Sequence, residues 1–274
     1  MPHSKNPPSP EQQNTAPWAG EAHAPSPGKA VAEDPPWGIG DVVRIAVVAA
    51  IAIGLFSMIA MGVAITNAGP VHVSTSDLAR NPRVVVPAQF AAYLVVVIYM
   101  VWLVRSPGRS FWPVVGWHWP RVRWVGWAGL GVALALMVQA ASTLLPIPQS
   151  LPIDRYFRDT AGAYMMTVFG VTFAPLVEEL FFRGFMYAAL ARRLGMMAAV
   201  LITAALFAFI HTSQLANAWA PLLLLFFVGV VLTAVRARTG SVATTFLVHV
   251  GYNGTLFTLL YVASDAFRHL ERLS

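Results

Sequence analysis

The sequence has no cysteine and few charged residues. Without cysteine, the chain has no disulfide bond, thiolate metal site, covalent haem attachment or cysteine nucleophile. Asp, Glu, Lys and Arg make up 11% of its 274 residues, against about a quarter in ordinary globular chains, and 57% of the residues are hydrophobic. This composition excludes a soluble globular domain and indicates a polytopic membrane protein.

The formal net charge is +6, but the arginines do not gather into one basic segment. They stand at the ends of apolar runs, where Lys and Arg set the orientation of membrane helices instead of binding nucleic acid. We therefore expect no nucleic-acid partner, and we expect the lipid bilayer to surround most of the chain.

Seven apolar runs are long enough to cross a hydrocarbon core about 30 Å thick. They lie at about 42–66, 84–104, 124–145, 163–190, 196–212, 219–237 and 241–263. The sequence therefore predicts an all-α fold, a polytopic membrane helix bundle of about seven or eight transmembrane helices over residues 41–274. Residues 1–40 hold nine of the twenty prolines and show no apolar period, which predicts a disordered tail.

Orientation follows from the loops between the runs. With seven crossings, loops 105–123, 191–195 and 236–240 lie on the same side as the tail, and this side carries most of the Lys and Arg residues. Because cytoplasmic loops are enriched in Lys and Arg, the N-terminus is predicted to be cytoplasmic.

Six polar residues interrupt three of the apolar runs. They are Glu178, Glu179 and Arg183 in the fourth run, His211 in the fifth, and His249 and Asn253 in the seventh. A charged group at the centre of a bilayer costs at least about 2.5–3.5 kcal/mol, so such groups normally face a partner or a wet cavity. Counting about 1.5 Å per residue from the predicted helix ends puts the three helices' polar groups at similar depths, which predicts one shared site.

Helical geometry separates the two glutamates. Glu179 and Arg183 are four residues apart, so they share a face and can form an ion pair that supports the structure. Glu178 points about 100° away around the helix and remains the carboxylate available for chemistry. His249 and Asn253 repeat the four-residue spacing, so both project from one face of the last run.

These residue types can activate water in two ways. In one, Glu178, His211 and His249 hold a metal, with zinc the best candidate, and a bound water fills the open position. In the other, Glu178 and His211 deprotonate water directly, while His249 and Asn253 donate hydrogen bonds to the oxyanion formed on a scissile carbonyl. Both routes hydrolyse a peptide bond.

Three motifs carry a family resemblance. "EELFFR" (178–183), "FAFIH" (207–211) and "HVGYN" (249–253) resemble, in this order, the EExxxR, FxxxH and HxxxN patterns of the CPBP family, the CAAX protease and bacteriocin-processing (Abi) intramembrane proteases. The resemblance covers about 163–263. The HExxH motif of site-2 zinc proteases and the GxSxG-like motif of rhomboids are missing from the sequence.

The resemblance implies an intramembrane peptidase that cleaves a membrane-associated or lipidated polypeptide. Glu178 and His211 would activate water, and His249 and Asn253 would stabilise the oxyanion. Relatives in this family often have eight transmembrane helices; eukaryotic ones trim prenylated CAAX tails, and bacterial ones act in peptide maturation, bacteriocin immunity and regulated proteolysis. The alternatives are a catalytically silent membrane scaffold of the same fold and a proton-coupled transporter that uses Glu178 and His211 as a relay.

Overall fold

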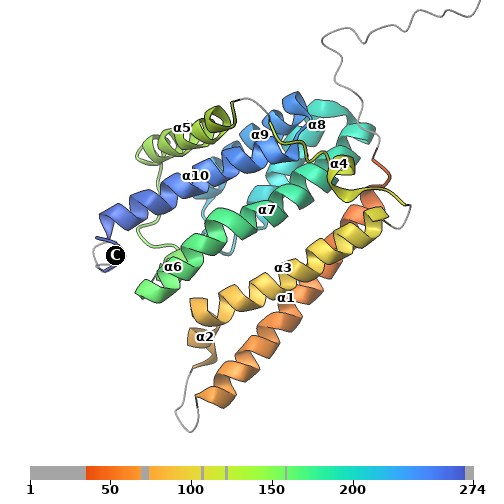
Figure 1. The fold of residues 1–274 in the computed structure, drawn as a ribbon. Helices are drawn as coiled ribbons and strands as arrows, with labels where there is room; N and C mark the ends of the chain where they lie inside the picture. Colours follow the sequence, from red (N-terminus) through yellow and green to blue (C-terminus); the bar gives the residue numbers. More distant parts are fainter. Residues whose placement is uncertain (1–34, 69–73, 106–107, 121–122, 158, 269–274) are drawn as a thin grey trace, which may run out of the picture. The chain divides into compact units, whose positions relative to one another are not determined.

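The computed structural model describes residues 35–68, 74–105, 108–120, 123–157 and 159–268 (Figure 1). All regular structure in these ranges is helical, as the sequence predicts. The elements are α1 (Ile39–Asn67), α2 (Thr75–Leu78), α3 (Pro82–Arg105), α4 (Phe111–Val114), α5 (Trp124–Ser142), η2 (Pro152–Phe157), α6 (Thr160–Val168), η3 (Phe169–Phe173), α7 (Ala174–Glu179), η4 (Leu180–Met186), α8 (Tyr187–Phe209), α9 (Trp219–Thr239) and α10 (Val242–Ala263). Of these, η2 is a 3₁₀-helix, and η3 and η4 are π-helical turns.

Six helical stretches of the described chain are long and apolar enough to cross a membrane: α1, α3, α5, the run from α6 to α8, α9 and α10. The predicted count of seven or eight is therefore not confirmed. The run from α6 to α8 is interrupted at Gly195, whose φ of 79° and ψ of 168° are non-helical. Only glycine adopts such a conformation at little cost. The interruption lies where the sequence predicts one apolar run to end and the next to begin.

The outer surfaces of these helices are apolar. Ile51 and Met58 of α1 are 64% and 68% exposed, and Phe209 at the end of α8 is 67% exposed. A helix that is hydrophobic on all sides is stable only where its outer face also meets apolar surroundings. The six apolar stretches and their exposed apolar side chains indicate a multi-pass integral membrane protein.

The helix that carries His249 and Asn253, α10, packs closely on α5. A Cβ atom added to Gly251 would collide with the carbonyl oxygen of Ala128, and one added to Gly131 would collide with the carbonyl oxygen of Val248. Glycine at both positions lets the two backbones approach each other, as small residues do in many membrane helix pairs. This contact supports α10 from the side of α5.

The packed chain begins before α1. Trp37 is 1% exposed, its ring stacks on Phe185 with centroids 4.3 Å apart, and its Nε1–H donates to the Phe185 carbonyl at 3.0 Å. Arg192 donates to the carbonyl oxygens of Pro35 and Trp37. Most of the predicted tail lies outside the described residues, but its last residues, from 35 on, belong with the packed helices.

Candidate active site

The two glutamates lie between two π-helical turns. In a π-turn the backbone hydrogen bonds run from residue i to i+5, which widens the helix and is frequent at functional sites. Carbonyl groups of the second turn, η4, accept hydrogen bonds from outside the helix: Arg236 Nε donates to the Arg183 carbonyl at 3.1 Å, and Trp37 donates to that of Phe185. These contacts fix η4, and with it the Arg183 side chain.

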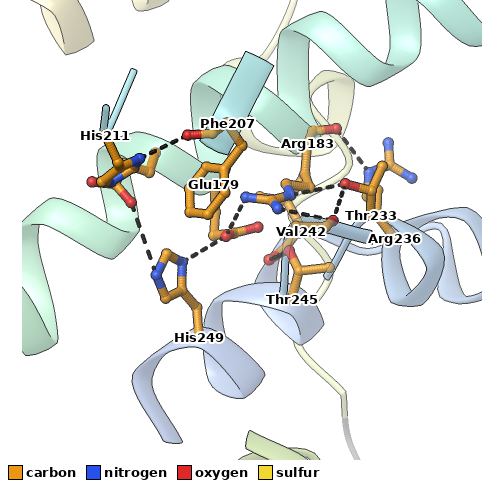
Figure 2. Close-up of polar contacts among 11 residues, drawn as sticks. Glu179, Arg183, Phe207, His211, Thr233, Arg236, Val242, Thr245 and His249 are labelled. Carbon is orange, nitrogen blue, oxygen red and sulfur yellow. Dashed lines mark hydrogen bonds and ion pairs between the residues drawn. The ribbon is translucent and has the colours of Figure 1, made fainter. Parts of the chain in front are cut away.

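Glu179 and Arg183 form a fully buried ion pair. Arg183 Nη1 lies 2.9 Å from Glu179 Oε1, and both side chains are 0% exposed. The contact predicted from the four-residue spacing is thus present, even though Glu179 ends α7 and Arg183 lies in the π-turn η4. Figure 2 shows the two side chains in contact beside the ring of Phe207. The pair neutralises a charge that would otherwise be very costly in this apolar interior.

Helix α9 completes the environment of Arg183. Arg183 Nε donates to Thr233 Oγ1 at 3.3 Å, and Nη2 donates to the carbonyl of Gly229 at 3.3 Å. The guanidinium carbon also lies 4.7 Å from the centroid of the Phe207 ring, which is cation–π range. We call Glu179, Arg183 and Thr233 the buried charge cluster.

His249 connects this cluster to Glu178. Its Nδ1 lies 2.7 Å from Glu179 Oε1, the same oxygen that binds Arg183. Its Nε2, on the far side of the ring, lies 3.8 Å from Glu178 Oε2. A carboxylate that accepts from Nδ1–H fixes the ring and its tautomer, and it stabilises a proton on the other nitrogen.

The contact between Glu179 and His249 was missed by reasoning from sequence. The two residues are 70 positions apart, so no helical spacing relates them. One signal was available: a buried carboxylate has two oxygens and seeks more than one donor, and His249 is a polar residue on a neighbouring apolar run.

His211 lies just after α8, in a turn that follows Phe209. Its Nδ1 is 2.7 Å from the carbonyl oxygen of Phe207, so Nδ1–H donates to that carbonyl and Nε2 is left as an acceptor. The Phe207 ring is 1% exposed and packs against the rings of both His211 and His249, with centroids 4.9 and 5.9 Å apart. Phe207 therefore spaces the two imidazoles.

Asn253 reaches the first π-turn. Its Nδ2 donates to the carbonyl of Gly170 in η3 at 2.7 Å. Glu179 thus holds His249, and Asn253 holds η3. One N–H of the Asn253 amide remains for another acceptor.

A cavity of about 500 Å³ brings the predicted catalytic residues together. Glu178, His211, His249 and Asn253 all line it. The Glu178 side chain is 14% exposed, whereas Glu179 and Arg183 are fully buried behind the wall and do not line the cavity. A cavity of this volume lies in the range that binds small ligands or a short peptide segment.

The residues do not fit the zinc site that the first of the two routes requires. Ligand atoms lie about 2.0–2.2 Å from a bound zinc ion, so three ligands must converge on one point. Within the described ranges no three His, Asp or Glu side chains are arranged to hold a metal ion, and this includes Glu178, His211 and His249. We therefore take no step of the reaction through a metal.

Comparison with known proteins agrees with the motifs. Residues 160–255 match the sequence model of the family described as type II CAAX prenyl endopeptidase Rce1-like. This is the CAAX protease family that the three motifs resemble. The matched segment contains all six predicted site residues. No curated protein and no solved structure matches the chain.

Proposed function

We propose that this multi-pass membrane protein is an intramembrane endopeptidase that hydrolyses a peptide bond of a membrane-associated or lipidated polypeptide. One observation carries the proposal: Glu178, His211, His249 and Asn253, from three separate stretches of chain, line one cavity among apolar helices. The name of the matched family, a prenyl endopeptidase, supports the same reaction. No feature of the described residues favours the scaffold or the transporter.

Water activation falls to Glu178 and His211. Glu178 faces the cavity and is not held by Arg183, so its carboxylate can accept a proton. The free Nε2 of His211 can accept a second hydrogen bond from the same water. In this mechanism the water oxygen forms a bond to the scissile carbonyl carbon as its proton passes to Glu178.

His249 and Asn253 stabilise the oxyanion that results. His249 donates to Glu179 through Nδ1–H, and when the ring is protonated its Nε2–H points toward the cavity side, where Glu178 lies. The second amide N–H of Asn253 is the other donor. The C–N bond then breaks, and the leaving nitrogen takes the proton from Glu178, so the products are a free acid and an amine.

The test compares new protein N-termini in native membranes that carry either the wild-type chain or Glu178→Gln at equal expression. The amide keeps the shape of the side chain and loses the base. N-termini that appear only with wild type would identify substrates. If labelling and mass spectrometry find the same N-termini in both membranes, the peptidase proposal is wrong.

We also infer seven membrane crossings, because Gly195 divides the run from α6 to α8, and a cytoplasmic N-terminus, because seven crossings put most Lys and Arg residues on its side. The chain has no cysteine, so single cysteines report sidedness directly. Leu194→Cys and Ser4→Cys should react only from the cytoplasmic side, and Ser213→Cys only from the opposite side. Labelling of Leu194→Cys and Ser213→Cys from the same side would show that residues 196–212 do not cross the membrane separately.

A further inference from the structure

A tyrosine outside the matched segment lines the same cavity. Tyr93 lies on α3, where Gln89 Nε2 donates to its hydroxyl oxygen at 3.1 Å. Its ring packs on Phe169 and Phe173 of η3, with centroids 5.8 and 6.4 Å apart. Because Gln89 occupies one side of the oxygen, the hydroxyl proton points elsewhere, and none of the described residues accepts it in a hydrogen bond.

Three other N–H groups of the site already have partners. Nδ1–H of His211 is engaged with Phe207, Nδ1–H of His249 with Glu179, and one amide N–H of Asn253 with Gly170. The hydroxyl of Tyr93, like the second amide N–H of Asn253, is a donor that the fold leaves available to a substrate. An O–H group that also accepts a hydrogen bond is polarised and becomes a stronger donor.

Position singles out Tyr93 among the tyrosines of the cavity. Tyr156 and Tyr252 also line it, but of these three Tyr93 is the one with ring contacts to Phe169 and Phe173 of η3. Tyr93 therefore lies beside the turn that leads directly into α7, the helix that carries Glu178. The ionisable groups that line this cavity are Glu178, His211, His249, Tyr93, Tyr156 and Tyr252.

We infer that Tyr93 is a further catalytic residue, whose hydroxyl donates a hydrogen bond to the scissile carbonyl oxygen as negative charge develops there. The inference rests on the proposed peptidase function. The phenol keeps its proton throughout, so the hydrolysis remains balanced as described above. A fixed donor aimed at a developing oxyanion in a cavity of low polarity lowers the barrier more than it strengthens substrate binding.

The first experiment measures turnover of a fluorogenic peptide built on a cleavage sequence found in the N-terminus comparison. Tyr93→Phe should lower kcat by about 100–1,000-fold, as for a lost oxyanion donor, with little change in KM. Gln89→Leu should give a smaller loss, because it removes only the group that directs the hydroxyl. The matched control is Tyr99→Phe, on the same helix but outside the cavity, which should turn over like wild type.

The second experiment separates catalysis from folding. A trifluoromethyl ketone of the same peptide forms a tetrahedral hydrate that mimics the oxyanion intermediate. Its inhibition constant should weaken in Tyr93→Phe by the same factor as kcat/KM, while the melting temperature stays at the wild-type value. A lower melting temperature with unchanged ketone binding would assign Tyr93 a structural role and overturn the inference.

The outcomes distinguish this inference from the proposed function. If wild type and Glu178→Gln cleave the peptide equally, the peptidase proposal fails. If Glu178→Gln is inactive while Tyr93→Phe turns over at the wild-type rate, the peptidase proposal stands and only the role of Tyr93 is wrong.

Discussion

Glu178 and Glu179 are neighbours on one helix, yet they lie in two different environments. Glu179 is fully buried and binds both Arg183 and His249 through one oxygen. Glu178 is 14% exposed and lines the cavity, where Nε2 of His249 lies 3.8 Å away. One carboxylate completes a buried charge balance, and the other remains available to a proton. The adjacent acids in the motif therefore have separate tasks.

His249 lies where the two environments meet. Its Nδ1 contacts Glu179 of the buried charge cluster, and its Nε2 faces Glu178. We therefore expect substitutions in the cluster to lower stability first, and substitutions in the cavity wall to lower turnover first. Each prediction below tests that division.

The largest effect should come from His211 on the cavity side. His211→Ala removes the imidazole that accepts from the attacking water, and we expect peptide cleavage to fall by about 100–10,000-fold. The melting temperature in detergent should stay near wild type, because the lost hydrogen bond joins the ring only to a carbonyl four residues away.

The matched control is His118→Ala, since His118 is exposed and lies outside the cavity. It should leave both turnover and melting unchanged. A large fall in melting temperature for His211→Ala would place this histidine with the structural residues and would contradict the division.

The next effect concerns the cluster. Glu179→Gln leaves the buried Arg183 without a counter-charge, so we expect the free energy of unfolding to fall by about 2–5 kcal/mol. Denaturant unfolding in detergent measures this change. Glu178→Gln, one residue earlier, serves as the control and should unfold like wild type, because Glu178 is not paired with Arg183.

A double substitution sharpens the comparison. Replacing both partners, Glu179→Gln with Arg183→Met, removes the unpaired buried charge and should restore part of the stability that either single change removes. Additive losses in the double variant would show that the two side chains do not act as a pair.

Sequence reasoning located the contacts that depend on helix spacing. Glu179 forms an ion pair with Arg183, as their four-residue separation predicts. His249 and Asn253 share a helix face and both line the cavity. The interruption at Gly195 also lies at the predicted end of an apolar run. Each of these features follows from the local repeat of a helix.

The features that sequence missed depend on how distant segments meet. The bond from His249 to Glu179 spans 70 residues, and the contact of Trp37 with Phe185 spans 148. A Pro-rich segment gives no local sign that one of its tryptophans is buried. The π-turns are equally hidden, because both segments read as part of one apolar helical run, and a shift of the backbone hydrogen bonds from i+4 to i+5 leaves no mark on that pattern.

A smaller effect is expected at the edge of the cluster, in a pair of buried threonines. Thr233 Oγ1 accepts from Arg183, whereas Thr203 Oγ1, on α8, has no hydrogen-bond partner among the described residues. Thr233→Val should therefore cost about 1 kcal/mol of stability, and the same change at Thr203 should be neutral or stabilising. Thermal unfolding of the two variants measures the difference. Equal losses of stability in Thr233→Val and Thr203→Val would mean that Thr233 does not support Arg183.

The smallest effect should come from an exposed counterpart of the buried ion pair, Asp159 with Arg83. Arg83 Nη2 lies 3.0 Å from Asp159 Oδ1, and both side chains are exposed to solvent.

Two hydrogen bonds hold the pKa of Asp159 below its ordinary value: the larger contribution comes from the backbone N–H of Gly162, and a smaller one from Arg83. Since the folded pKa is the lower one, the stabilisation is complete above the unfolded pKa of about 3.9 and is lost as the pH falls through the folded pKa. Asp159→Asn keeps a capping side chain, so we expect a loss of about 1 kcal/mol or less at neutral pH that shrinks as the pH falls from about 4 through the lower folded pKa. Melting temperatures of wild type and Asp159→Asn across this pH range measure the difference, and a loss as large as that of Glu179→Gln would show that burial does not separate the two pairs.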